Sequence, residues 1–122
     1  MILADTSIWV DHFRRRDVAL SQQLQESNIS THPFIVAELA LGNLPDRRNA
    51  LVLLDRLPAV KVAQLTEVRR MVETRSLFQR GIGLIDANLI ASALITPYTL
   101  LWSRDKRLQE IAESLGLSAP MS

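Results

Sequence analysis

The feature that most constrains this chain is its alternation of short apolar segments with longer stretches of helical periodicity. Apolar runs that predict strands lie at residues 1–4 and 99–102, and residues 28–30 are a candidate for a short strand. Segments with apolar residues at helical spacing separate them. Parallel strands need long crossover connections, which helices supply, and both faces of the sheet are then covered. We therefore predict an α/β fold with a short parallel sheet flanked by helices.

Periodicity, capping residues and helix breakers predict the remaining elements. The expected helices span 7–14 (a turn or helix), 19–26, 34–44, 47–57, 66–78, 84–95 and 106–115, and a brief strand is expected at 60–62. The helix at 84–95 is apolar on most faces, which predicts that it is buried. A chain of 122 residues without an internal repeat or linker suits one domain, and we predict a single domain over residues 1–122.

Composition excludes several classes of protein and site. The chain has no cysteine, so disulfides and thiolate metal sites are ruled out. Fourteen Lys and Arg residues against thirteen Asp and Glu give a net charge of +1, so bulk charge does not indicate nucleic-acid binding. No apolar run reaches the ~20 residues that a membrane helix requires. The start of the chain lacks the pattern of a secretory leader, and we expect a cytoplasmic protein.

Four acidic residues stand out because of their apolar surroundings. Asp5 ends the first predicted strand, and Asp105 follows the last one. Glu38 is the only charge in its predicted helix, and Asp86 opens the most apolar helix. Carboxylates in such surroundings are costly unless they are paired, hydrogen-bonded or bound to a metal. The C-terminal ends of parallel strands meet at one edge of a sheet, so we expect the four acids to gather there.

A cluster of carboxylates repels itself unless a cation is present. Oxygen ligands without His or Cys suit Mg²⁺ or Mn²⁺ better than zinc. Each acid alone also has a structural explanation: Asp5, Asp86 and Asp105 could cap helices, and Glu38 could point to water from a helix surface. The coincidence of four acids at one predicted sheet edge favours the metal site.

The other charged and polar groups have simpler interpretations. The remaining acids, Asp17 among them, are interpreted as solvated surface charges, and Asp11 has nearby partners for pairing at 14–16. His12 and His32 are interpreted as surface or packing residues. Trp9 and Trp102 are predicted to be buried near the strand ends.

In these acidic motifs the sequence resembles a PIN domain, specifically the VapC-like ribonuclease toxins of type II toxin–antitoxin modules. The resemblance spans nearly the whole chain and lies in four motifs: Asp5-Thr6-Ser7, Glu38-Leu39, Asp86-Ala87 and Ser103-Arg104-Asp105. It implies a PIN-like fold in which Asp5, Glu38 and Asp86 are the main metal-binding and catalytic acids. Asp105 matches a fourth acidic position of the family, whose occupant varies.

The same resemblance implies secondary site residues. Thr6 and Ser103 match hydroxyl residues that line the pocket in the family. Asn88 follows Asp86 on the same predicted helix and is expected to add an oxygen or a water contact.

The resemblance also implies an activity, a cofactor and partners. The activity is hydrolysis of RNA phosphodiester bonds by an endoribonuclease, with Mg²⁺ or Mn²⁺ as the cofactor. The partners are the RNA substrate, a cognate VapB-like antitoxin protein and a second copy of the chain in a homodimer. The preference for RNA over DNA comes from the resemblance alone, because no residue is identified as a reader of the 2′-hydroxyl.

Local basic clusters are candidates for RNA contact despite the balanced total charge. They lie at 14–16, 47–48, 69–70 and 104–107, and each could instead be a solvated helix surface. Arg104 and Lys106 flank Asp105, which makes them the best candidates for contact with a phosphate.

An apolar stripe in the helix predicted at 47–57 is expected to exceed what a small core absorbs. Its members are Ala50, Leu51, Leu54 and Leu57. We expect this stripe to contribute to a groove for a partner helix or to a self-association face.

Two other functions stay open. The first is a catalytically inactive PIN-like module that binds RNA or protein. The second is a phosphotransfer domain with Asp5 as the acceptor, which is disfavoured because no Asp-x-Asp follows the first strand. A nucleophilic triad built on Ser7 and His12 has no supporting spacing.

Overall fold

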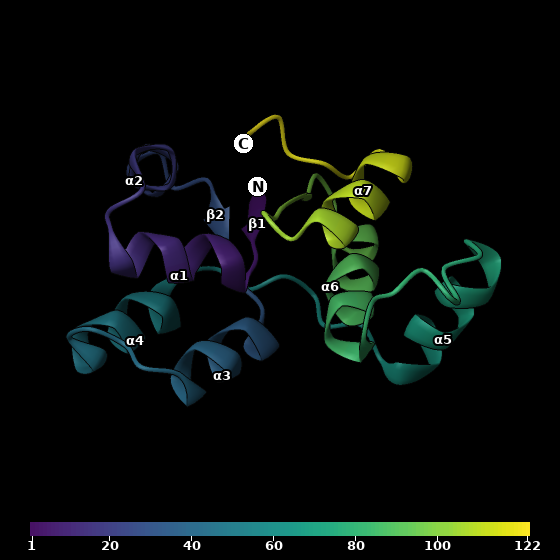
Figure 1. The fold of residues 1–122 in the computed structure, drawn as a ribbon, viewed down its shortest axis with the longest axis horizontal. Coiled ribbons are helices and arrows are strands. Elements are labelled where there is room, and N and C mark those ends of the chain that lie inside the picture. Colours follow the sequence, from purple (N-terminus) through teal and green to yellow (C-terminus); the bar gives the residue numbers. More distant parts are fainter.

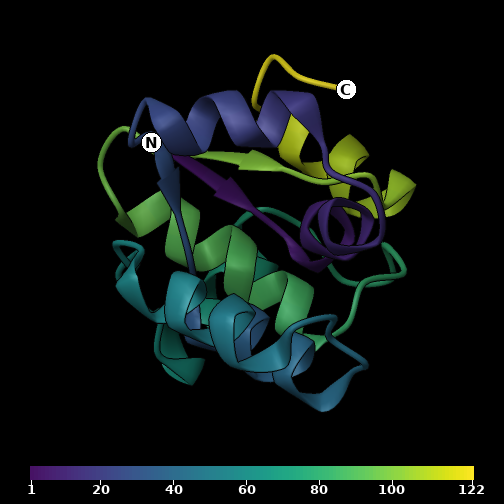
Figure 2. The same cartoon turned by 90° about the vertical axis from the view of Figure 1, so that its left-hand side faces the viewer.

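The computed structural model describes all 122 residues and contains one parallel sheet of three strands. The strands are β1 (Ile2–Ala4), β2 (Ile29–Ser30) and β3 (Leu100–Trp102), and their order in the sheet is β2-β1-β3. The central strand β1 pairs in parallel with both neighbours, and the three strands lie side by side in Figure 2. The predicted α/β fold with a short parallel sheet is confirmed.

Seven helices surround the sheet. They are α1 (Thr6–Arg14), α2 (Val18–Gln25), α3 (Pro33–Leu41), α4 (Arg47–Arg56), α5 (Leu65–Thr74), α6 (Leu84–Ile95) and α7 (Lys106–Ser114). Helices α1 to α4 lie on one side of β1, and α5 to α7 lie on the other (Figure 1). None of the helices combines the length and the apolar character needed to cross a membrane.

The hydrophobic core is built around the sheet. Leu3 of β1 and Leu101 of β3 are completely buried, as are most residues of α6. All strand residues except the partly buried Leu100 are buried, which explains why β1 and β3 are continuous apolar runs in the sequence. Trp9 and Trp102 are also completely buried, which confirms the prediction for both.

The strand predicted at 60–62 does not form. An isolated parallel bridge joins Thr31 to Ala59 just before this segment, and the N–H of Val60 donates to the backbone oxygen of Thr31 at 2.9 Å. The following backbone N–H group, that of Lys61, donates to the side-chain hydroxyl of Thr96 at 2.9 Å. A backbone N–H that donates to a side chain cannot pair with a neighbouring strand. The alternation of apolar and polar residues at 60–62 therefore did not lead to a strand.

Two predicted helices are shorter than expected. The helix predicted at 34–44 ends at Leu41, where Gly42 is the C-cap and Pro45 follows three residues later. The helix predicted at 66–78 spans 65–74. It begins after Gln64, whose backbone N–H donates to the carboxylate of Glu67 at 3.0 Å, so Glu67 rather than the predicted cap defines this terminus.

The apolar stripe of residues 50–57 packs partly into the core. Ala50 and Leu54 are buried, and Leu51 and Leu57 pack against the core as partly buried residues. Leu54 and Leu57 also line an apolar pocket beside α3, so the expectation that the stripe contributes to a groove for a partner stays a prediction.

Candidate active site

Asp5 lies where β1 ends and α1 begins, and only 5% of its surface is exposed. One carboxylate oxygen caps α1 by accepting hydrogen bonds from the backbone N–H groups of Ser7 (3.0 Å) and Ile8 (3.4 Å). The hydroxyls of Ser7 and Ser103 donate to the two oxygens, each at 2.5 Å. Burial raises the pKa of Asp5, and the hydrogen bonds from Ser103 and Ser7 offset part of that rise.

Two serine hydroxyls join the β1–α1 connection to the β3–α7 connection. Besides donating to Asp5, the Ser7 hydroxyl accepts from the backbone N–H of Arg104 at 2.9 Å. The Ser103 hydroxyl accepts from the backbone N–H of Asp105 at 3.0 Å. Asp105 in turn caps α7 through two backbone N–H groups, at 3.0 and 3.1 Å. The ends of the neighbouring strands β1 and β3 are thereby held in a fixed relation.

Glu38 reaches the same region from the second turn of α3, rather than from a first turn as expected. It is partly buried, and its carboxylate accepts a hydrogen bond from the hydroxyl of Thr6 at 3.0 Å. Thr6 is the first residue of α1 and directly follows Asp5. Glu38 is thus placed beside the end of β1.

Asp86 is the third residue of α6, and Gly83 occupies the N-cap position in its place. Burial raises the pKa of Asp86 to about 6, together with the negative charges of Asp105, Asp5 and Glu38, in that order. Each of the other three carboxylates therefore acts on Asp86 electrostatically. The structure brings the four acids into one neighbourhood at the C-terminal edge of the sheet.

The four acids do not form a preassembled cage for a metal ion. No three acidic or histidine side chains lie close enough to one another to hold an ion together. Asp5 and Asp105 are engaged as helix caps, as the structural explanations for single acids had suggested. The cap bonds of Asp105 use only one of its carboxylate oxygens, so the other is not engaged by them.

Asn88 does not face this cluster. It is 1% exposed, and its side-chain oxygen lies 2.8 Å from the Nε2 atom of His32 and accepts from the hydroxyl of Ser92 at 2.9 Å. Its amide nitrogen donates to the backbone oxygen of Ala63 at 3.0 Å. The expected contact of Asn88 with the metal pocket is contradicted, because core hydrogen bonds occupy its amide.

His32 is a buried packing residue, in agreement with the prediction. Its Nδ1 atom accepts from the backbone N–H of Phe34 at 3.0 Å, which caps α3. Because Nδ1 is an acceptor, the proton of the neutral ring is on Nε2, which donates to Asn88. Burial lowers the pKa of His32.

Arg104 is engaged within the protein instead of being free for a phosphate. Its guanidinium forms ion pairs with Asp11 at 2.8 Å and Asp17 at 2.5 Å, the only two ion pairs in the structure. It also lies 5.5 Å from the ring centre of Trp102. The expectation that Asp11 pairs within 14–16 is wrong, and Asp17 is more than a surface charge. Of the two predicted phosphate contacts, Lys106 is the exposed residue without an ion pair.

Ser7 was not named as a site residue from the sequence, although its position two residues after Asp5 predicts a hydrogen bond between the two side chains. A serine two residues after a strand-terminal aspartate is placed to return a hydrogen bond to that side chain in an Asx-type turn. Thr6 and Ser103, which were named from the resemblance, do contact acids of the cluster.

Similarity to known proteins identifies the family. The family model of the PIN domain matches residues 2–114, a range that includes all four acids. Ribonuclease VapC32 of Mycobacterium tuberculosis is 40% identical over 118 residues, in strain CDC 1551 / Oshkosh and in strain ATCC 25618 / H37Rv. The alignment covers 97% of this chain and 95% of the relative. The chain therefore belongs to the PIN domain family, within its VapC-like group.

Proposed function

We propose that this protein is a metal-dependent endoribonuclease that acts as the toxin of a toxin–antitoxin pair. The observation that carries the proposal is the group of four acids at the end of β1, in which three carboxylates help raise the pKa of Asp86 to about 6. Perturbed acids gathered at the C-terminal edge of a parallel sheet are typical of a functional site. The relative named Ribonuclease VapC32 supports RNA as the substrate.

The donor groups suit Mg²⁺ or Mn²⁺. All four are carboxylates, and the chain has no cysteine to supply a thiolate ligand. Mg²⁺ commonly keeps several waters and binds through one or two carboxylates, so a closed cage of side chains is not required. We assign Asp5, Glu38, Asp86 and Asp105 to hold the ion, directly or through its waters. When bound, the ion supplies positive charge that activates water and stabilises charge developing on the phosphate.

The surrounding side chains prepare the acids for this role. Hydrogen bonds from Ser7 and Ser103 fix the carboxylate plane of Asp5. Thr6 orients Glu38 in the same way. In the cation-free protein a proton on Asp86 relieves repulsion within the cluster, so a divalent ion and a proton compete for this carboxylate.

The family also supports partners for the proposed toxin. We assign it a cognate VapB-like antitoxin that blocks it in the resting cell, and a homodimeric assembly. We also propose a cytoplasmic location, which is consistent with an RNA substrate and such an antitoxin.

The test is cleavage of a mixed cellular RNA pool by purified protein without a partner, in Mg²⁺, in Mn²⁺ and in EDTA. Asp5→Asn and Asp86→Asn run alongside Asp55→Asn, a matched control in which an exposed acid of α4 is changed. We expect discrete fragments that require metal, vanish in the first two variants and persist in the control. Intact RNA in every wild-type reaction would contradict the proposal. RNA that is bound but never cut would favour a non-catalytic PIN-like module.

A further inference from the structure

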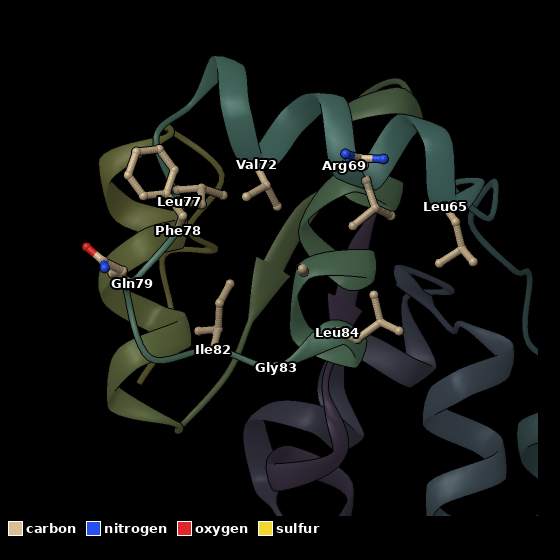
Figure 3. Close-up of a pocket in the computed structure, with 11 residues that line it drawn as sticks. Leu65, Arg69, Val72, Leu77, Phe78, Gln79, Ile82, Gly83 and Leu84 are labelled. Atoms are coloured by element: carbon tan, nitrogen blue, oxygen red, sulfur yellow. The ribbon is translucent and has the colours of Figure 1, made fainter.

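An apolar pocket of about 420 Å³ lies between α5 and the beginning of α6 (Figure 3). Leu65, Arg69 and Val72 of α5 lie across from Ile82 and Leu84 on the opposite wall. Leu84 is 60% exposed. Exposed apolar surface gathered around a pocket usually marks a binding site, because a soluble protein gains nothing by leaving it uncovered.

This pocket and the candidate active site share the first turn of α6. Gly83, Leu84 and Ala87 line it, and Asp86 lies between the last two in the first turn of α6. A ligand in the pocket is therefore held by the same turn that presents the acid. Leu84 and Asp86 are two positions apart and point to different faces of α6, so an RNA chain that occupies both sites has to pass around this turn.

Phe78 lines the pocket from the loop that joins α5 to α6, and it is 54% exposed. The other two phenylalanines of the chain are partly buried against their neighbours. The loop has a defined shape, because Gln79 and Gly81 adopt left-handed backbone angles (φ 62° and 80°). Arg107 also donates to the backbone oxygen of Gly81 at 3.3 Å. An exposed ring on a braced loop is suited to stacking on a nucleobase.

Arg69 is the one charged residue that lines the pocket, and two further cations lie in nearby segments of the chain. Arg80 lies in the loop that joins α5 to α6, and Lys106 is exposed beside Asp105. None of these three cations is in an ion pair, and no acidic residue lines the pocket. Unpaired cations are available to neutralise phosphates. An apolar protein helix is the other possible occupant, but the nearby cations, the exposed ring and the shared turn with Asp86 favour RNA.

We propose that this pocket is a nucleobase-binding subsite, in which Phe78 stacks on a base near the scissile phosphate and Arg69 and Arg80 contact the RNA backbone. The proposal rests on the ribonuclease function proposed above. It assigns substrate binding to the α5–α6 loop, and it replaces Arg104 with these two arginines as phosphate contacts.

The test measures binding of a short fluorescein-labelled single-stranded RNA of mixed sequence by fluorescence anisotropy, in Mg²⁺. All proteins carry Asp86→Asn so that RNA is not consumed. Adding Phe78→Ala is expected to weaken binding about 5- to 150-fold, as loss of one stacked base does, whereas Phe78→Trp retains the affinity. Arg69→Gln and Arg80→Gln are each expected to lower the slope of log affinity against log salt by about 0.7.

Arg56→Gln is the matched control, because Arg56 is exposed on α4, which lies across the molecule from α5 (Figure 1). The RNA affinity and the salt slope of the Arg56→Gln protein are expected to equal those of the protein that carries Asp86→Asn alone. Unchanged affinity in a Phe78→Ala protein with native circular dichroism would overturn the proposal. The proposal would also be overturned if Phe78→Ala converted a dimer to a monomer and kept its RNA affinity, because the pocket would then be an interface between two copies of the chain.

Cleavage kinetics separate this proposal from the function on which it rests. Without the Asp86 change, Phe78→Ala is expected to cut RNA with a raised KM. Metal-dependent cleavage with an unchanged KM would overturn the subsite and leave the ribonuclease intact. A wild-type protein that neither binds nor cuts RNA would overturn both.

Discussion

The Asp86 carboxylate is expected to destabilise the cation-free protein at neutral pH. Its pKa is raised from 3.8 to about 6 in the folded state, by burial and by three neighbouring carboxylates. Between these two values the folded state binds more protons than the unfolded state. The contribution of Asp86 therefore lowers the free energy of unfolding as the pH rises from about 4 to about 6, and its full penalty is present above that range.

The size of the penalty follows from the shift. About two pKa units correspond to about 3 kcal/mol, and solvent screening of a partly exposed group lowers this to about 1–2 kcal/mol. Asp86→Asn keeps the side-chain shape and removes the charge. We expect it to raise the free energy of unfolding at neutral pH by that amount, which for a domain of this size raises the Tm by about 3–10 °C. The same change is expected to abolish cleavage.

The assay is thermal unfolding followed by circular dichroism in EDTA, across a series of pH values. The Tm of Asp86→Asn is expected to rise above that of the wild type from about pH 4 upward and to reach its full margin above the pKa of about 6, while Asp55→Asn on α4 follows the wild type. Added Mg²⁺ is expected to stabilise the wild type more than Asp86→Asn, because ligand binding to the folded state raises stability. A variant that is no more stable than the wild type at neutral pH would refute the reasoning.

Three further predictions concern the groups around the site. Arg104→Met removes both ion pairs and is expected to lower the free energy of unfolding in urea by about 1–2 kcal/mol. The same substitution is expected to cost less in a protein that already carries Asp17→Asn; an equal cost in both backgrounds would contradict a contribution from the Arg104–Asp17 pair. Because burial lowers the pKa of His32, its contribution to the free energy of unfolding is expected to fall as the pH drops below ~6.5, where the histidine of the unfolded chain gains a proton. If His32→Gln loses stability equally steeply over this pH range, His32 is not the source. Ser103→Ala leaves a buried oxygen of Asp5 without its donor and is expected to cost about 1–3 kcal/mol, with Ser114→Ala on α7 as a control that costs less.

The placement of the acids was largely predictable from local sequence. Asp5 and Asp105 each come just after an apolar strand, and parallel pairing of β1 with β3 brings those two ends together. Glu38 and Asp86 were harder to place, because a helix position alone does not tell which way the helix runs past the sheet. Their assignment depended on the coincidence of four acids and on the family resemblance.

The errors have identifiable physical causes. Asn88 follows Asp86 by two residues, and helix positions two apart point to different faces, so its separation from the cluster could have been foreseen. The ion pairs of Arg104 could not, because Asp11 and Asp17 are 93 and 87 residues away in the chain. Nothing local distinguishes these acids from solvated ones. Such long-range pairings are set by the tertiary fold.

Binding of Mn²⁺ to the partner-free protein is the sharpest test of the proposed metal site. Electron paramagnetic resonance, which reports the concentration of free Mn²⁺, measures this binding. The account predicts saturable binding to the wild type, with affinity lost in Asp5→Asn, Glu38→Gln and Asp86→Asn and retained in Asp55→Asn. Absence of saturable binding to the wild type, or equal binding by all four variants, would contradict the assignment of these acids as the metal site.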